Sequence, residues 1–283
     1  MIETSEKEVN EEHALAIKRS QVEIVCPGCR SGELDRVPFN GNVHCRKCGA
    51  AYRVNGTIID VLPEYTVKRY FWHDIVEWDF FVDVYESWFW RSGPYGNIVF
   101  GISFDDEFKL ISNIHQIKGK KSLVDIACGP GIYSRPFARQ LNEGTVVGLD
   151  LSMPMLEYAS TKAQHINNLF FIHGDAQDLP FFENSLDGAN CCGALHLFPD
   201  IPRTLKGVLR VLKPGAHFTV ATVKVPNIGP VSRKLSYWYH RYGGVKSFVP
   251  EELERLFGEA GFTDFVCHHA VRWWTIVSAQ KPG

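Results

Sequence analysis

The sequence of 283 residues contains no hydrophobic run long enough to cross a membrane. Its first 20 residues are polar and acidic, with only residues 14–17 apolar, so they do not match a secretory leader. An excess of one charge is also missing, since the formal net charge is -2. These absences predict a protein without a membrane span, and they argue against the broad basic surface of a nucleic-acid-binding protein.

Cysteine is the one residue type whose spacing stands out. Four of the eight cysteines form two CxxC pairs separated by 15 residues, namely Cys26, Cys29, Cys45 and Cys48. This spacing predicts a tetrahedral four-cysteine zinc site, and four protein ligands leave no open position for catalysis, so we expect a structural Zn²⁺. The other cysteines, among them Cys128 and Cys192, fall in or beside predicted strands, where free thiols pack as small apolar groups. A reducing compartment, the cytoplasm, fits this usage.

The segment 123–134 is an apolar run that contains an acid, Asp125, and ends in a turn with Gly129 and Gly131. A strand followed by such a turn can hold either a dinucleotide or S-adenosylmethionine (SAM), and the motif alone is weak evidence for both. A dinucleotide fold usually carries a third glycine where this sequence has Ser134. The carboxylate of Asp125 would repel a pyrophosphate, whereas the zwitterionic end of SAM tolerates it, so the turn favours SAM.

Three further segments continue the alternation of strands and helices. Residues 145–150 predict a second strand that ends at Asp150, where a carboxylate can accept from ribose hydroxyls. A helix should follow, with Ser152 as its N-cap and Met155 on its apolar face. Residues 169–180 predict a third strand and a polar turn in which Asp175 can accept from an adenine amine and Ala176 can donate its N–H. Residues 185–196 predict a fourth strand that leads to His196.

Together these motifs resemble the class I SAM-dependent methyltransferases of the ubiquinone/menaquinone-methyltransferase-like group, from about residue 123 to the C-terminus. The resemblance implies an α/β fold with a Rossmann-like, seven-stranded, mainly parallel sheet, helices on both faces and an antiparallel last strand. It also implies SAM as cofactor, with contacts from Asp125, Ala127, Gly129, Gly131, Asp150, Leu151, Met155, Asp175, Ala176, Gln177 and Cys192. Ala127 stands where this family more commonly has glycine.

The N-terminal module resembles the zinc ribbons of the methyltransferase-activator group. Residues 51–63 predict a hairpin that turns at Asn55 and Gly56. We therefore expect a flexible N-terminus at 1–20, a zinc ribbon at 21–64, an aromatic-rich helical segment at 65–118 and the methyltransferase domain at 119–283. Within that domain, residues 224–248 are expected to form a lid insertion.

Two aromatic segments are candidate walls for a methyl acceptor. Between the modules, residues 70–100 are rich in Phe, Trp and Tyr, and the lid has its own aromatic group. In each segment the aromatic residues can line an acceptor pocket or simply pack helices onto the sheet, and the sequence leaves both interpretations open. The residues that we assign to the acceptor are Trp88, Tyr237, Trp238, His240 and Tyr242.

Two residues are candidates for catalysis. His196 follows the fourth predicted strand, where open α/β sheets gather their ligands, and a neutral imidazole can take a proton from the acceptor. It can equally shape the pocket without proton transfer. Tyr85 lies in a tyrosine-acid pair, Tyr85-Glu86, that resembles one found near SAM in related enzymes.

Three functions remain open. The first is methyl transfer to a small apolar or aromatic metabolite at carbon, nitrogen or oxygen, which the aromatic segments favour. The second is methylation of a guanine in ribosomal RNA, because such enzymes also resemble a zinc ribbon joined to this fold. Against it stands the charge balance, although the ribbon has basic residues such as Arg30, Arg46 and Lys47. The third is a non-catalytic SAM-binding scaffold that docks a protein partner through the ribbon.

Overall fold

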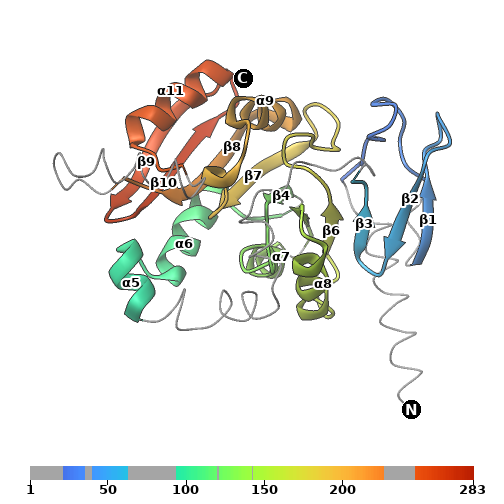
Figure 1. Cartoon of the computed structure of the whole chain (residues 1–283), viewed down its shortest axis with the longest axis horizontal. Helices are drawn as coiled ribbons and strands as arrows, with labels where there is room; N and C mark the ends of the chain where they lie inside the picture. The colour runs from blue at the N-terminus through green and yellow to red at the C-terminus, as the bar shows by residue number, and fades with distance from the viewer. Residues whose placement is uncertain (1–21, 36–39, 63–93, 120, 142, 226–245) are drawn as a thin grey trace, which may run out of the picture.

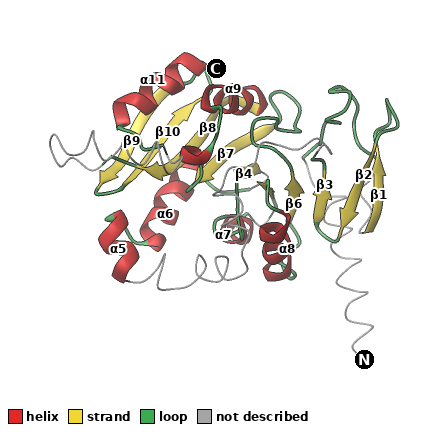
Figure 2. Ribbon diagram, in the orientation of Figure 1, coloured by secondary structure: helices red, strands yellow, loops and turns green. Residues whose placement is uncertain are grey.

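The computed structural model of the chain describes residues 22–35, 40–62, 94–119, 121–141, 143–225 and 246–283. Figures 1 and 2 show how the elements are arranged. The strands are β1 (Asn40–His44), β2 (Ala51–Asn55), β3 (Ile58–Asp60), β4 (Ser122–Ile126), β5 (Thr145–Asp150), β6 (Leu169–His173), β7 (Leu186–Cys192), β8 (Leu212–Val223), β9 (Thr263–Val271) and β10 (Trp274–Gln280). The helices are α5 (Pro94–Phe100), α6 (Phe104–His115), α7 (Ser134–Gln140), α8 (Met153–Lys162), α9 (Ile201–Val211), α11 (Pro250–Ala260) and the short 3-10 helix η1 (Leu195–Leu197).

The strands from β4 onward are neighbours in one sheet, in which β4 lies between β5 and β7. Their order is β6-β5-β4-β7-β8-β10-β9, and the neighbours from β6 to β8 are all parallel. Strand β10 is antiparallel to both β8 and β9. The expected seven-stranded sheet with an antiparallel last strand is therefore confirmed. The chain reverses its direction of strand addition at β4, so the carboxyl ends of β4, β5 and β7 lie at a topological switch point, the usual place for a ligand in such sheets.

In the part of the chain that the structure describes, the sheet has ten strands rather than the expected seven, because the N-terminal strands β1, β2 and β3 join its edge (Figure 1). Strands β2 and β3 form the predicted hairpin, but its turn is at Gly56 and Thr57 rather than at Asn55 and Gly56, because Asn55 pairs with Ile58 as the last residue of β2. Strand β3 then runs parallel to β6, with Ile58 opposite Phe171 and Asp60 opposite His173. Without these strands, β6 would present unpaired N–H and C=O groups at an open edge, so the added strands satisfy its backbone.

Helices cover the two faces of the sheet (Figure 2). Buried side chains of α9 and α11, such as Leu205 and Phe257, belong to one hydrophobic core. Ile111 of α6, Phe137 of α7 and Leu156 of α8 belong to a second core. Of the helices that the structure describes, none combines the length and apolarity needed to cross a membrane. The helices and the sheet therefore form a layered α/β architecture.

Several predicted features lie outside the described residues. They include the N-terminus 1–20, most of the aromatic-rich segment at 65–118, and the interior of the expected lid at 224–248. Tyr85 and the residues assigned to the acceptor fall in the same group, namely Trp88, Tyr237, Trp238, His240 and Tyr242.

Candidate functional site

The predicted cofactor residues follow the carboxyl ends of four neighbouring parallel strands. The turn with Gly129 and Gly131 follows β4, and Asp150 ends β5. Asp175 comes two residues after β6, while His196 lies in η1 after β7. Because β6, β5, β4 and β7 are adjacent and parallel, these residues share one edge of the sheet.

The turn after β4 depends on left-handed backbone conformations. Ala127, Gly129 and Gly131 have φ values of 53°, 53° and 78°. A Cβ atom on Gly131 would come within 3.3 Å of the Ala159 Cβ atom, whereas one on Gly129 would meet nothing within 4 Å. The first glycine therefore faces open space, and the second allows the turn to pack on α8. Glycine adopts this conformation freely, while an alanine such as Ala127 pays a steric cost of about 1–2 kcal/mol.

Asp150 ties the ends of β4 and β5 together. One of its carboxylate oxygens accepts from the Gly129 N–H at 2.7 Å, and the other accepts from the Ser152 N–H at 2.9 Å. Ser152 is also the N-cap of α8, as the sequence predicts, and accepts from the Met155 N–H. Burial raises the pKa of Asp150, although these backbone hydrogen bonds oppose the shift. The carboxylate is thus fixed next to the glycine turn.

Asp125 lies within β4 and is almost completely buried, at 2% exposure. Its two oxygens accept from the Ser134 hydroxyl at 2.6 Å and from the Asn190 side-chain amide at 2.8 Å. Burial raises the pKa of Asp125 to about 6, because these hydrogen bonds offset only part of the desolvation. Sequence reasoning missed both partners, although a polar Asn190 inside an apolar strand was a signal that something buried needs it.

The turn after β6 is stabilised by hydrogen bonds to Asp175. Asp175 accepts from the Gln177 N–H at 2.8 Å, and the Asp175 carbonyl accepts from the Asp178 N–H at 2.9 Å. Among the hydrogen bonds of the described residues, none uses the Ala176 N–H. The turn therefore offers a carboxylate and a backbone donor side by side, the pair that an adenine edge requires.

The remaining cofactor assignments lie in the surrounding packing. Met155 is buried in α8, and Cys192 is buried at the end of β7, where its thiol donates to the Asn190 side-chain oxygen at 3.3 Å. Leu151 is partly buried, and its carbonyl accepts from His173 at 3.0 Å. His173 was also missed from the sequence, because its partners come from distant segments.

His196 is buried at the edge of the same region. Its Nδ1 atom is 3.1 Å from the Thr222 hydroxyl, at the end of β8. Burial lowers the pKa of His196 to about 4, so the ring is neutral at physiological pH. A neutral ring can accept a proton, but so low a pKa makes it a weak base.

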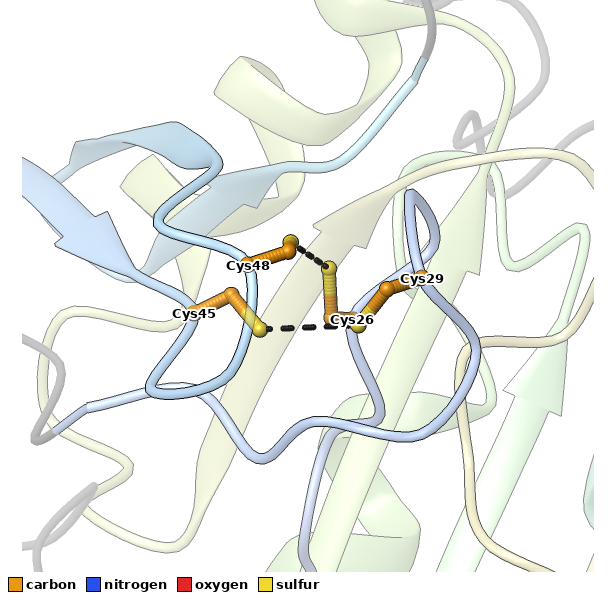
Figure 3. A group of neighbouring side chains, drawn as sticks. All are labelled: Cys26, Cys29, Cys45 and Cys48. Carbon is orange, nitrogen blue, oxygen red and sulfur yellow. Dashed lines mark hydrogen bonds between the residues drawn. The ribbon is translucent and has the colours of Figure 1, made fainter.

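The four CxxC cysteines come together in one cluster (Figure 3). Their sulfur atoms all lie within 4.8 Å of one another, and two sulfur pairs, Cys26 with Cys48 and Cys29 with Cys45, are 3.7 Å apart. Four thiolates around zinc with bonds of about 2.3 Å would have edges of about 3.8 Å. The cluster therefore has the size of a tetrahedral metal site.

The two CxxC turns have matching backbones. The Arg30 N–H donates to the Cys26 carbonyl at 2.8 Å, and the Gly49 N–H donates to the Cys45 carbonyl at 2.9 Å. A hydrogen bond from the Ser31 backbone lowers the pKa of Cys29 to about 6, although desolvation opposes it. The Tyr52 hydroxyl contacts the Cys26 sulfur at 3.1 Å. Despite desolvation, the Tyr52 hydrogen bond also lowers the pKa of Cys26. At Cys48 a hydrogen bond from the Ala50 backbone is outweighed by the neighbouring Cys45 thiol and by desolvation, so its pKa is raised to about 11. The surroundings therefore favour the metal-binding thiolate at Cys26 and Cys29 but not at Cys48.

Comparison with known proteins agrees with this geometry. Residues 123–215 match the model of a methyltransferase domain family. A demethylmenaquinone methyltransferase of Staphylococcus haemolyticus is 34% identical over 134 residues, which cover 47% of this chain but only 55% of that relative. A demethylmenaquinone methyltransferase of Staphylococcus epidermidis is 30% identical over 179 residues, which cover 56% of this chain and 73% of that relative.

A solved structure shares the fold at low sequence identity. Phosphoethanolamine N-methyltransferase 2 of Haemonchus contortus, in complex with S-adenosyl-L-methionine, matches with a TM-score of 0.62 and 17% identity. The match covers 78% of this chain and 62% of that chain. The strand order, the glycine turn, the series of strand-end acids and the sequence relatives agree, and the chain belongs to the class I SAM-dependent methyltransferases.

Proposed function

We propose that the protein transfers a methyl group from SAM to a small apolar or aromatic molecule. The observation that carries the proposal is the series of strand-end groups at one edge, with the Gly129 turn, Asp150 and Asp175 following β4, β5 and β6. Such a series matches a ligand that is elongated across the strands, as a nucleoside with an amino-acid tail is.

The cofactor would lie across this edge with its methionine part at β4 and its adenine at β6. The turn formed by Ala127, Gly129 and Gly131, above the buried Asp125, would hold the methionine part. Asp150 uses two of its four acceptor positions on backbone N–H groups, which leaves two for ribose hydroxyls. Asp175 and the Ala176 N–H would receive the adenine, with Leu151, Met155, Gln177 and Cys192 around it.

The chain's own residues would mainly orient the reaction. When bound, SAM supplies an electrophilic methyl group, which forms a bond to the acceptor as the carbon–sulfur electron pair stays on sulfur. His196 would take the proton that the acceptor loses, and Tyr85 is proposed to lie near the same site. Because the sulfonium is already a good leaving group, alignment of acceptor and methyl group accounts for much of the expected rate.

For the acceptor, the relatives' names suggest a quinone-type aromatic ring, and Trp88, Tyr237, Trp238, His240 and Tyr242 are proposed to contact it. The ribbon gives little support to RNA as substrate. Arg30 pairs with Asp178, and Arg46 pairs with Glu33 and Asp35. Two of the basic side chains that could bind phosphate are therefore already neutralised.

We further propose that Cys26, Cys29, Cys45 and Cys48 hold a structural Zn²⁺. The 3.7 Å sulfur pairs and the four-thiol donor set support zinc, and a site with four protein ligands has no position left for substrate. All eight cysteines lie in the described residues as free thiols. A reducing compartment such as the cytoplasm would keep them so.

A labelling experiment tests the proposal. Purified protein is incubated with methyl-labelled SAM and either a demethylated naphthoquinone or ribosomal RNA, and label transfer is measured. We expect transfer to the quinone, about 100-fold weaker in Asp150→Ala than in the wild-type protein. The exposed α8 variant Glu157→Ala is the control and should keep full activity. Label found only in RNA would overturn the acceptor class, and SAM binding without any transfer would favour a scaffold.

A further inference from the structure

The N-terminal ribbon, residues 22–35 and 40–62 with the cysteine cluster and β1 to β3, contacts the main sheet. The contact lies next to the proposed adenosine end of the cofactor site. The Val61 N–H donates to the His173 carbonyl at 3.0 Å, and the Phe171 N–H donates to the Thr57 carbonyl at 2.8 Å. Beyond the end of β6, the Val25 N–H donates to the Pro180 carbonyl at 2.9 Å. The ribbon therefore forms backbone hydrogen bonds with β6 and with residues on both sides of the turn that contains Asp175.

The first of two side-chain links joins a CxxC turn to this loop. Arg30 directly follows Cys29, and its guanidinium forms a bidentate ion pair with Asp178. The Asp178 N–H in turn donates to the Asp175 carbonyl at 2.9 Å. Bidentate arginine–carboxylate pairs fix orientation as well as distance. The position of the Asp175 turn is thus tied to the cysteine cluster.

The backbone conformation of Arg30 is one that favours glycine over arginine. Arg30 has φ 57°, and Gly49, the equivalent residue of the second CxxC turn, has φ 74°. Glycine adopts this left-handed conformation without steric cost, and arginine does not. The first turn nevertheless carries an arginine where the second carries glycine, and that arginine is the residue that reaches Asp178.

The second link runs from β3 through His173 to the ribose side. The His173 Nδ1 atom is 2.8 Å from the Asp60 carboxylate, and its Nε2 atom is 3.0 Å from the Leu151 carbonyl. A carbonyl and a carboxylate only accept hydrogen bonds, so both ring nitrogens must donate and the ring is an imidazolium. Leu151 follows Asp150 directly, so this link holds the backbone beside the proposed ribose acceptor.

We propose that the ribbon positions the adenosine-binding edge of the cofactor site, with Arg30 and His173 as the positioning residues. The inference rests on the proposed function, since it assigns a role toward SAM. Each link stabilises one loop in its bound shape, the Asp175 turn through Arg30 and the Asp150–Leu151 segment through His173. A loop that is already ordered loses less conformational entropy when a ligand binds, so affinity rises without any new contact to the ligand.

The test is the dissociation constant of SAM, and of S-adenosylhomocysteine, measured by calorimetry on the full chain. Arg30→Gln should weaken binding about fivefold, the low end of the usual coupling range, because the pair is partly exposed to water. His173→Phe keeps a ring but removes both donors, and should also weaken binding about fivefold or more. In turnover assays KM for SAM should rise while kcat and the acceptor KM stay unchanged.

Arg46→Gln is the matched control. Arg46 is in the second CxxC turn, but its partners Glu33 and Asp35 lie within the ribbon, so its loss should leave SAM affinity unchanged. Metal content and melting temperature are measured for every variant, so that loss of the ribbon itself is recognised. The swap Arg30→Asp with Asp178→Arg should restore affinity that either single change removes.

The outcomes separate this inference from the function on which it rests. If the wild-type protein binds neither SAM nor S-adenosylhomocysteine, the proposed function is wrong. If the wild-type protein binds and Arg30→Gln and His173→Phe bind equally well with intact metal and stability, the positioning role is wrong. Equal weakening by Arg46→Gln would likewise overturn it, because the effect would then be a general one of the ribbon.

Discussion

At the scale of single residues, the buried Asp125 carboxyl group carries a cost in stability. Its pKa is raised from 3.8 to about 6 by desolvation, so the folded protein binds this proton more tightly than the unfolded chain does. Stability therefore falls as the pH rises from about 4 to about 6, and the loss persists at pH 7. A pKa difference of this size corresponds to about 3 kcal/mol at most.

Asp125→Asn should raise the free energy of unfolding at pH 7 by about 1–3 kcal/mol and give no gain near pH 4. An asparagine keeps one oxygen for Asn190 and can donate its amide to the Ser134 hydroxyl. Urea denaturation at both pH values measures the effect. Asp200→Asn, at the exposed N-cap of α9, is the control and should show no such pH-dependent gain. Equal gains at both pH values would contradict the raised pKa.

A second residue-scale prediction concerns the role of His196 as a base. Because burial lowers its pKa to about 4, the ring is already neutral throughout pH 5.5–8. The rate constant kcat should then stay level across this range rather than fall below pH 6.5, and His196→Ala should lower it about 100-fold. The exposed His165→Ala is the control and should match the wild-type protein. Full activity of His196→Ala across the range would leave His196 a purely structural role.

At the scale of elements, α6 packs on β7 through a glycine. A Cβ atom on Gly188 would lie 2.7 Å from both the His115 Nδ1 atom and the Leu123 Cδ2 atom. Gly188→Ala should therefore push α6 from the sheet and lower the free energy of unfolding by about 1–3 kcal/mol. Gly207→Ala is the matched control, since Gly207 is inside α9 with no atom within 4 Å of the new methyl group, and should stabilise the protein by about 0.5–1 kcal/mol. Thermal and urea unfolding of both variants measure the two changes in stability. If Gly188→Ala and Gly207→Ala had similar effects, the predicted clash at Gly188 would be wrong.

The parallel strands β4, β5, β6 and β7 could be predicted from local sequence. The strand at 145–150 has the predicted bounds, because a fully buried parallel strand is a continuous apolar run that ends where the chain turns polar. The cysteine cluster also follows from spacing alone, since a CxxC turn directs both thiols to one point. The junction between β3 and β6 could not be predicted in this way. It pairs Ile58 with Phe171, and nothing local marks partners that far apart in the chain.

The same limit applies to the site. The acids at strand ends were predicted because their positions are set by the alternation of strand and turn. The roles of Asn190, His173 and Arg30 were missed because each residue acts through a contact with a distant segment. A single polar residue in the sequence does not indicate which distant residue it contacts. A three-residue strand such as β3 is also too short to show a period.

At the scale of the whole molecule, the ribbon and the methyltransferase sheet share one core. Buried ribbon residues such as Val54 and Ile59 belong to the same hydrophobic cluster as Leu149 and Ile172 of the main sheet. Hydrogen bonds of β3 also complete the edge of β6. Two parts that share a core and a sheet should unfold together, so we expect one cooperative transition for the chain.

Removing the metal should therefore destabilise the entire protein and not the ribbon alone. Chelation, or Cys26→Ser, is expected to lower the melting temperature of the single calorimetric transition by about 10 °C or more, because metal binding free energy is part of the folding free energy. Cys267→Ser, at an exposed free thiol of β9, removes a cysteine far from the cluster along the sheet and should leave metal content and melting temperature unchanged. Two separate transitions, of which only the smaller responds to chelation, would mean that the ribbon folds independently. In that case the contacts through Val61, Arg30 and His173 would not be strong enough to couple the ribbon to the cofactor edge.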